Sequence, residues 1–271
     1  MTEHLLQAVQ EYVEENIGAE FHDKRLDTVK EKRLKDVLKR KNPYLFKAKA
    51  QDAAQLIRSI LDAFLSSQEE TIFGEFLEGV AVFVAKQLHE GFKPSIDELT
   101  GIDLVFEKNG KVFAVDIKSG PNWGNDSQKQ KMYRNFSEAI VRLQPRYPAQ
   151  RILPINGCMY GKDSRPRKLG KIKEARVVIE QVEYWKLCGQ DFWDFIAGNR
   201  QLYLEIIEPL GYQAEQRNEN FQKEYGKFIT KMTREFLIEY SDEDGGIAWE
   251  KLTHFVSASK AANTLSHFSP T

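Results

Sequence analysis

The chain has 271 residues, of which 41% are hydrophobic and 29% charged, and its formal net charge at pH 7 is −1. This composition provides enough apolar side chains for a sizeable core, and it excludes an intrinsically disordered chain and a globally basic, histone-like protein. The two cysteines, Cys158 and Cys188, lack the spacing of a zinc knuckle or a disulfide framework. No basic segment followed by an apolar stretch stands at the N-terminus, so we expect a soluble, cytoplasmic protein.

Helical patterns dominate the first 90 residues of the sequence. Apolar side chains recur there at helical spacing, and Asn42-Pro43 is a clear helix end. Ser66 and Ser67 are suitable caps for a helix that has Glu69 and Glu70 in its first turn. The predicted helices cover residues 2–17, 20–41, 48–65 and 66–89.

Strand patterns begin at residue 102, so we expect a mixed α/β chain with a central sheet flanked by helices. We predict one domain over 1–271, with a helical N-terminal addition over 1–60, a core over 61–185 and a mostly helical C-terminal addition over 186–271. The predicted elements are a hairpin over 102–118, a loop over 119–126, a helix over 127–143, a strand over 151–160, a basic loop over 162–174, a strand or helix start over 175–184, helices over 190–208 and 214–240, and a short element over 249–255.

Charge is segregated along the chain although its sum is close to zero. Residues 24–41 carry nine Lys or Arg against three acids, and residues 162–176 carry seven against two. Residues 62–107, between them, carry ten acids against two lysines. A single charged run is compatible with an ordinary solvated surface. Two basic segments on either side of an acidic one favour a phosphate-binding surface around a metal centre.

The segment 101–118 predicts a β-hairpin whose register follows from its turn. Asn109-Gly110 between two β-rich runs is typical of a type I′ turn, in which both central residues need positive φ. Lys108 then pairs with Lys111. Strand alternation leaves one face wholly apolar, and we expect a helix to bury it. That face consists of Ile102, Leu104, Phe106, Phe113, Val115 and Ile117.

The same register places Asp103 directly opposite Asp116, with Cβ atoms roughly 5 Å apart. Facing like charges destabilise a sheet, and a bridging divalent cation is the simplest compensation. Two carboxylates with open water positions suit Mg²⁺. Lys118 projects from the same face, where its ammonium can position a water or neutralise charge on a phosphate. The alternative is a solvated hairpin face with two chance acids.

The first-strand Asp103, the hairpin and Asp116-Ile-Lys118 together resemble the PD-(D/E)xK nuclease superfamily. This resemblance implies a restriction-endonuclease-like core of a helix, three antiparallel strands, a second helix and a fourth strand. Only two strands are apparent before residue 127, so we expect the third to lie within 92–101 or to be short. Ile102 stands where the superfamily often has proline. The superfamily commonly adds a glutamate from its first helix, and Gly74-Glu-Phe-Leu-Glu78 resembles that element. The resemblance therefore implies that Glu78 joins the catalytic and metal-binding residues, with Glu70 as the second candidate.

Four further blocks resemble type II restriction endonucleases, in particular small enzymes of the PmeII-like kind. This narrower resemblance runs from about residue 40 to 240. It implies Mg²⁺-dependent cleavage of both strands of double-stranded DNA at a short specific site. It also implies a homodimer, since palindromic sites are normally read by two-fold dimers, and a separate cognate DNA methyltransferase is a further expected partner. The blocks are 42–49, 66–74, 118–128 and 184–193.

Candidate DNA contacts lie in two loops of the predicted core. The loop over 119–126 directly follows Lys118, and its small and amide side chains suit a close approach to a sugar–phosphate backbone. The helix that follows begins with residues whose N–H groups can bind a phosphate. Arginine in the basic loop is the favoured partner of guanine. The candidates are Asn122, Trp123, Asn125, Ser127, Gln128, Arg165, Arg167, Lys168 and Lys171.

Three other functions stay open at this point. A structure-specific repair or junction nuclease would use the same fold and the same carboxylates. A catalytically silent DNA-binding or partner-binding module would keep the fold without the chemistry, although such a role gives no reason for facing carboxylates. A scaffold with no nucleic-acid partner would show no steep salt dependence of DNA binding.

Overall fold

The computed structural model describes residues 2–39, 41–49 and 52–258, and the chain divides into two compact units. The sheet unit comprises Met1–Glu20 and Glu70–Ala214, and the helical unit comprises Phe21–Glu69 and Glu215–Thr271. The parts of the predicted helices 20–41 and 48–65 that fall on residues 40, 50 and 51 lie outside the described residues. The division expected from the sequence, with a core over 61–185, stays a prediction.

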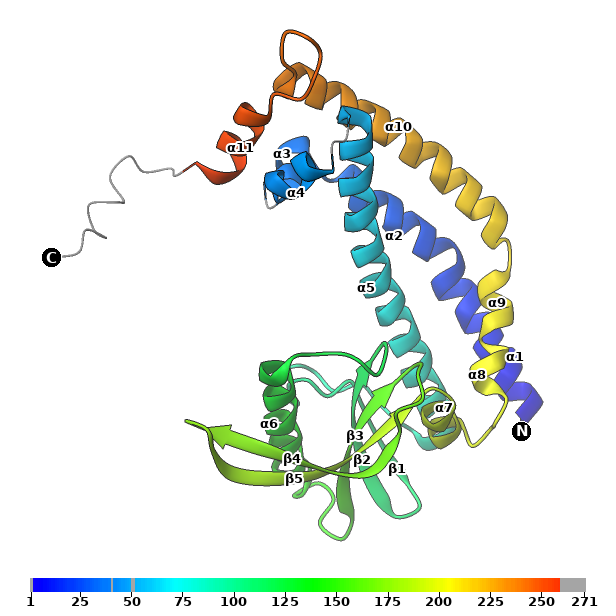
Figure 1. The fold of residues 1–271 in the computed structure, drawn as a ribbon. Helices are drawn as coiled ribbons and strands as arrows, with labels where there is room; N and C mark the ends of the chain where they lie inside the picture. The colour runs from blue at the N-terminus through cyan, green and yellow to red at the C-terminus, as the bar shows by residue number, and fades with distance from the viewer. Residues whose placement is uncertain (1, 40, 50–51, 259–271) are drawn as a thin grey trace, which may run out of the picture. The chain divides into compact units, whose positions relative to one another are not determined.

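Within the described residues of the sheet unit, five strands form one mixed sheet (Figure 1). They are β1 (Leu104–Lys108), β2 (Lys111–Lys118), β3 (Arg151–Cys158), β4 (Arg165–Glu174) and β5 (Val177–Cys188). Their order across the sheet is β1-β2-β3-β5-β4. The β1–β2 and β4–β5 pairs are antiparallel, whereas β2–β3 and β3–β5 are parallel. The parallel step from β2 to β3 passes through helix α6 (Asp126–Leu143), because parallel neighbours need a crossover. The sheet with its flanking helices and the helical parts at both ends confirm the predicted α/β fold.

The β1–β2 hairpin has the register that its turn predicts. Lys108 pairs with Lys111, and the pairing continues without a shift to Leu104 and Val115. Asn109 and Gly110 have φ values of 51° and 68°. Both turn residues thus occupy the left-handed region that a type I′ turn requires.

The regular pairing stops at the entrance to β1. The main-chain nitrogen of Asp103 donates to the carbonyl of Val115 at 2.8 Å. Val115 is already the register partner of Leu104, whereas Asp103 was expected to lie opposite Asp116. The chain reaches this point through a turn in which Gly101 has a φ of 69°, and this shifts Asp103 out of the ladder. On the outer edge of β1, Phe92 forms a single antiparallel bridge with Val105. Within the described residues no strand forms over 92–101, and this isolated bridge stands in place of the third strand expected there.

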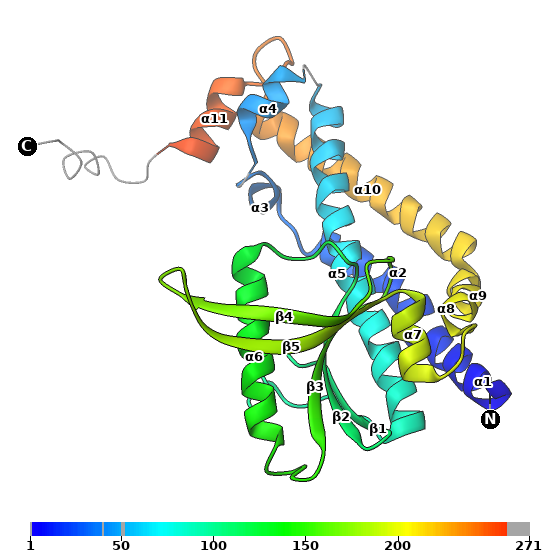
Figure 2. The same cartoon turned by 60° about the horizontal axis from the view of Figure 1, so that its bottom comes forward.

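Helices cover both faces of the sheet (Figure 2). On one face, α6 packs over a cluster that includes Val105 and also Ile102, which the alternation had assigned to the other face. On the opposite face, the rings of Phe106 and Phe113 contact Phe195 of α7 (Gln190–Ala197), with centroids 5.9 Å and 4.9 Å apart. The predicted burial of the apolar face is confirmed for these strand residues. The face that carries the acids is equally buried along most of its length.

The basic segment 162–174 was predicted to be a loop, and this was wrong, because most of it is strand β4. Ala175 and Arg176, with φ values of 46° and 72°, turn the chain into β5. The side chains of β4 are mostly exposed, so the apolar alternation that marks a strand is absent from its sequence. The segment 175–184, left open between strand and helix, is strand from residue 177 onward.

Helix α5 (Ala53–His89) replaces two predicted helices. Ser66 and Ser67 lie inside it rather than at its start, since neither Gly nor Pro interrupts the pattern around them. The predicted helix 190–208 is divided instead, because Gly198, at a φ of 65°, ends α7. The other helices in the described residues are α1 (Thr2–Val13), the π-helix η1 (Glu14–Gly18), α2 (Ala19–Lys30), α3 (Leu34–Leu38), α4 (Pro43–Ala48), α8 (Leu202–Glu205), α9 (Ile207–Gly211), α10 (Ala214–Tyr240) and α11 (Trp249–Ser257).

The helical unit has its own apolar core, to which α3, α5, α10 and α11 all contribute. Arg25, in the first basic segment, is buried in this unit. Its guanidinium pairs with Glu69 and lies 3.8 Å from the ring centroid of Phe221. Arg25 therefore stabilises the core rather than a phosphate-binding surface. No helix in the described residues is long and apolar enough to cross a membrane.

Candidate catalytic centre

Asp103 and Asp116 meet at the open end of the β1–β2 hairpin. The side chain of Asp116 is only 4% exposed. Asp103 Oδ2 accepts a hydrogen bond from the main-chain nitrogen of Ile117 at 2.7 Å. Burial raises the pKa of Asp116 to about 7; the ammonium of Lys118 acts against this rise, and the adjoining carboxyl group of Asp103 adds to it. Asp116 therefore resists ionisation unless further positive charge compensates it.

Lys118 is the cation nearest to this pair. Its ammonium donates to Asp116 Oδ1 and, at 3.1 Å, to the carbonyl of Ile117. The same nitrogen lies 5.3 Å from the ring centroid of Trp123. With 31% of its side chain exposed, Lys118 is held by three partners and still reaches solvent.

Glu78 approaches the same place from α5. Gly74, one turn earlier, allows the helix to pass close to the segment after Lys118, because a Cβ at this position would lie 2.8 Å from Ser119 Oγ. The predicted Gly-x-x-x-Glu spacing thus has a packing reason. Glu70, about two turns before Glu78, is exposed in the middle of α5 and not in a first helical turn.

The carboxylate of Glu78 is coupled to the centre by charge. Burial raises its pKa, a hydrogen bond from Lys93 lowers it, and the charge of Asp103 raises it. Lys93 Nζ lies 2.5 Å from Glu78 Oε1. The sequence reasoning missed Lys93, which offers no motif and is a single lysine in an acidic stretch.

A row of buried polar side chains extends from Asp116 across three neighbouring strands. In the sheet register Asp116 of β2 pairs with Asn156 of β3, and Asn156 pairs with Lys186 of β5. Their exposed fractions are 3%, 2% and 8%. Asn156 Oδ1 accepts from Trp123 Nε1 at 3.0 Å, and its Nδ2 donates to the carbonyl of Asp116 at 3.4 Å. Asn156 thereby fixes the indole against which Lys118 rests.

Lys186, at the far end of this row, holds two loops together. Its ammonium donates to the carbonyl of Pro121 at 3.0 Å and to Asp163 Oδ2 at 2.8 Å. Sequence reasoning missed both Asn156 and Lys186. Asn156 is a lone polar residue in the otherwise apolar run 152–158, and that signal was present in the sequence. Lys186 gave no such signal, because β5 also carries Glu180, Gln181 and Glu183.

A polar cavity of about 420 Å³ opens beside Asn156 and Lys186. Trp123, Asn122 and Lys168, three of the predicted DNA contacts, line it. The sequence reasoning did not single out the other lining residues that carry charge or aromatic rings. These are Lys129, Tyr133, Asp163 and Tyr184.

Other predicted DNA contacts at the start of α6 have structural partners. Asn125 is the N-cap of the helix, and its side chain accepts from the main-chain nitrogen of Gln128 at 3.0 Å. The side chain of Gln128 accepts from the nitrogen of Asn125 at 2.9 Å, which completes a capping box. Ser127 is exposed in the first turn of α6. The capping pair orders the loop, whatever else it contacts.

The basic residues of β4 do not share one face, because strand alternation separates them. Lys168 lines the polar cavity, whereas Arg167 lines a different depression on the face of Trp185. Arg165 and Arg167 lie 3.3 Å and 3.8 Å from acidic partners. Lys171 is exposed, and its carbonyl accepts a hydrogen bond from Gln130. The structure therefore brings Lys168, and not the whole basic run, to the side of the candidate centre.

The carboxylate pair fits a magnesium ion by its chemistry. Among the described residues, no group of three or more His, Cys, Asp or Glu side chains is arranged to hold a metal. Mg²⁺ does not require such a cage, since it usually binds one or two carboxylates, keeps several waters and takes substrate phosphates as further ligands. Asp103 and Asp116 offer this donor set, and a cation beside them would oppose the burial and the charge of Asp103 that raise the pKa of Asp116.

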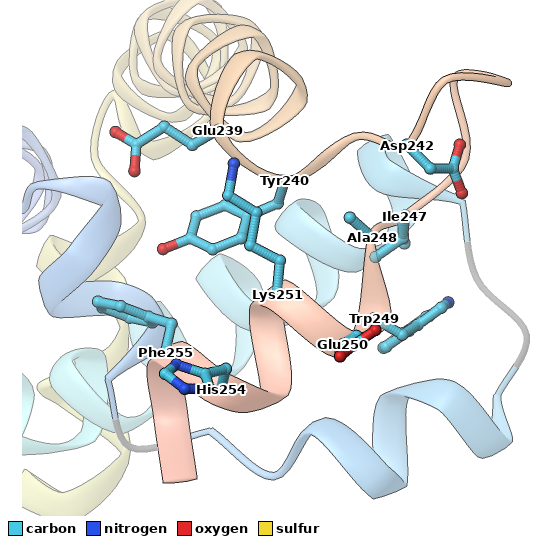
Figure 3. A pocket seen from close by; sticks show the side chains of 10 residues that line it. All are labelled: Glu239, Tyr240, Asp242, Ile247, Ala248, Trp249, Glu250, Lys251, His254 and Phe255. Atoms are coloured by element: carbon cyan, nitrogen blue, oxygen red, sulfur yellow. The ribbon is translucent and has the colours of Figure 1, made fainter. Parts of the chain in front are cut away.

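A second cavity, of about 770 Å³, lies within the helical unit (Figure 3). It lies between the end of α10 and α11, and its lining includes Tyr240, Trp249 and Phe255. None of the predicted site residues lines it. This cavity therefore has no part in the candidate centre.

Comparison with known families agrees with the fold. No curated protein matches the chain. The sequence model of the family described as type II restriction endonuclease EcoO109I matches residues 7–218. The match covers most of the chain, including every candidate catalytic residue. The chain belongs to this family of type II restriction endonucleases.

Proposed function

We propose that the protein is a Mg²⁺-dependent, site-specific endonuclease that cuts both strands of DNA at the end of the β1–β2 hairpin. The observation that carries this proposal is the pair of buried Asp116 and half-buried Asp103, with Lys118 hydrogen-bonded to Asp116, in a chain of a restriction endonuclease family. A PmeII-like subfamily is a narrower expectation that rests only on the sequence blocks.

Each residue of the centre has a distinct role in this proposal. Asp103 and Asp116 hold Mg²⁺ through their carboxylate oxygens, and Glu78 adds negative charge at the border of the site. When bound, the ion supplies Lewis-acid stabilisation of the negative charge that develops on the phosphate. Lys118 places its ammonium at the open side of the pair, where it donates a hydrogen bond to a phosphate oxygen or to the attacking water. Asn156 and Trp123 keep that ammonium in place.

We further propose that the active form is a homodimer, since a two-fold assembly presents two centres to the two strands of a palindromic site. A separate methyltransferase that modifies the same site is the expected partner, because an enzyme of this kind would otherwise cut the DNA of its own cell. Both proposals follow from the activity and not from any contact in the structure.

The test is digestion of a large, unmethylated phage DNA by the purified protein, with Mg²⁺ and separately with EDTA. A discrete ladder of fragments that appears only with Mg²⁺ is the expected result, and sequencing the fragment ends gives the recognition site. Asp116→Asn protein, purified in the same way, controls for a contaminating nuclease.

The other outcomes distinguish the remaining functions. A smear, or cutting restricted to branched substrates, supports a repair or junction nuclease of the same fold. DNA binding without cutting in either Mg²⁺ or Mn²⁺ supports a silent binding module. Either result contradicts the proposed activity.

A further inference from the structure

We propose that the polar cavity beside the centre binds one phosphodiester group of the substrate strand. This group flanks the scissile phosphodiester in the same strand. The cavity is lined by Lys129, Lys168 and Lys186. The proposal rests on the proposed nuclease activity and assigns to these lysines a site for the DNA backbone.

The charges in the cavity favour an anionic group. Three ammonium groups line it, against the single carboxylate of Asp163. The carboxylate of Asp163 is already hydrogen-bonded to Lys186, and this bond and the positive charges around it lower its pKa. Lys129 and Lys168 make no ion pair within the described part of the chain. Their charge is thus available to a ligand.

The position of the cavity relates it to the centre. Asp116, Asn156 and Lys186 occupy one row across β2, β3 and β5. Two strand spacings correspond to about 10 Å, and a DNA strand carries one phosphate per 3.4 Å of helix rise. A strand whose scissile phosphate lies at Asp116 therefore brings another phosphate to Lys186 within about three nucleotides.

Hydrogen bonds hold the residues between the cavity and the carboxylate pair in place. Trp123 lines the cavity, and its indole lies 5.3 Å from the ammonium of Lys118 and is hydrogen-bonded to Asn156. Lys186 fixes Pro121 and Asp163 at the rim, so the cavity needs little ordering when it binds. A preformed site loses less entropy on binding than one assembled around its ligand.

Lys129 and Lys168 give the cleanest test, because neither holds the fold together through an ion pair. We would measure binding of a fluorescent duplex in EDTA, which separates binding from cleavage, over about 50–200 mM salt. Because the cavity holds one phosphate, Lys129→Gln and Lys168→Gln should each reduce the slope of log K against log salt, and the double variant should reduce it by about 0.9. Lys131→Gln, an exposed lysine of α6 outside the cavity, is the matched control and should keep the wild-type slope.

The loss should be the same factor for a duplex with the mapped recognition site and for a scrambled duplex, since phosphate contacts carry no sequence information. Unchanged slopes in both lysine variants would overturn the proposal. A loss confined to the specific duplex would also overturn it, because the cavity would then hold a base.

A neutral methylphosphonate, placed in turn at each of the three linkages on either side of the scissile phosphate, locates the contact. One position should weaken wild-type binding and have little effect on Lys168→Gln. If every linkage affects both proteins equally, the cavity does not bind a flanking phosphate. The salt slopes on the scrambled duplex need no cleavage, so they fail independently of the proposed activity: a ladder with unchanged slopes refutes only the cavity.

Discussion

The two hairpins of the sheet differ in how far they are buried and in how clearly their sequences predict them. The β1–β2 hairpin is covered on both faces, and its alternation and Asn-Gly turn predict its register to the residue. The β4–β5 hairpin projects exposed charged and apolar side chains, and it has pairing shifts and a turn without glycine. A strand that is not required to bury one face leaves no periodic signal in its sequence.

The same contrast separates two functions. The buried hairpin carries acids whose charges are costly to hold together, which suits chemistry. The exposed hairpin carries cations in solvent, where they contribute little to stability and are available to DNA. We therefore expect substitutions in the first to affect cleavage and those in the second to affect binding.

The largest expected effect in the buried hairpin, apart from the aspartates, is that of Lys118→Met. The variant keeps most of the aliphatic stem and loses the ammonium, and its cleavage rate should fall by about 10³-fold. Single-turnover cleavage with enzyme in excess of DNA measures this directly. A wild-type rate would remove Lys118 from the catalytic residues.

Glu78→Gln should have a smaller effect, a loss of about 10–100-fold in rate, because Glu78 acts on Asp103 through charge from the border of the site. Glu75→Gln, on the same helix, is the matched control. A rise in the Mg²⁺ concentration needed for half-maximal rate should accompany the loss. Equal behaviour of the two variants would show that Glu78 has no special role.

The metal-free protein should become less stable as pH rises, because of Asp116. Its folded pKa, about 7, lies above the ordinary value of 3.8, so between these values the folded state holds a proton that the unfolded state has lost. The favourable contribution is present below pH 3.8 and is lost as pH rises toward 7. Asp116→Asn should therefore gain about 1–3 kcal/mol over wild type in EDTA near pH 8. Urea denaturation at pH 5 and pH 8 measures this difference. A variant less stable than wild type at pH 8 would contradict it.

The smallest effect is expected in the exposed hairpin. Arg165→Gln combined with Arg167→Gln should weaken DNA binding and reduce its salt slope by less than two units, since both guanidiniums already have acidic neighbours. Binding in EDTA at several salt concentrations is the measurement. A large loss specific to the recognition site would instead assign these arginines to base reading.

Sequence reasoning succeeded where local rules and burial agree, as in the hairpin register from Leu104 to Val115. The predicted pairing of Asp103 with Asp116 was wrong, because Asp103 leaves the ladder after a turn in which Gly101 has a positive φ. Sequence reasoning also failed for Asn156 and Lys186, because their row with Asp116 exists only once β3 and β5 are parallel neighbours. The contact of Lys93 with Glu78 likewise depends on tertiary structure. Pairings between strands distant in the sequence cannot be read from the pattern of any one segment.

The most direct test of the central claim is to measure cleavage and binding of one labelled duplex by wild type and by Asp116→Asn. The account predicts that wild type cuts both strands only with Mg²⁺. It also predicts that the variant does not cut but binds the duplex in EDTA at least as tightly, because one negative charge facing the phosphates has been removed. Cleavage by Asp116→Asn at the wild-type rate would show that the chemistry takes place elsewhere in the protein.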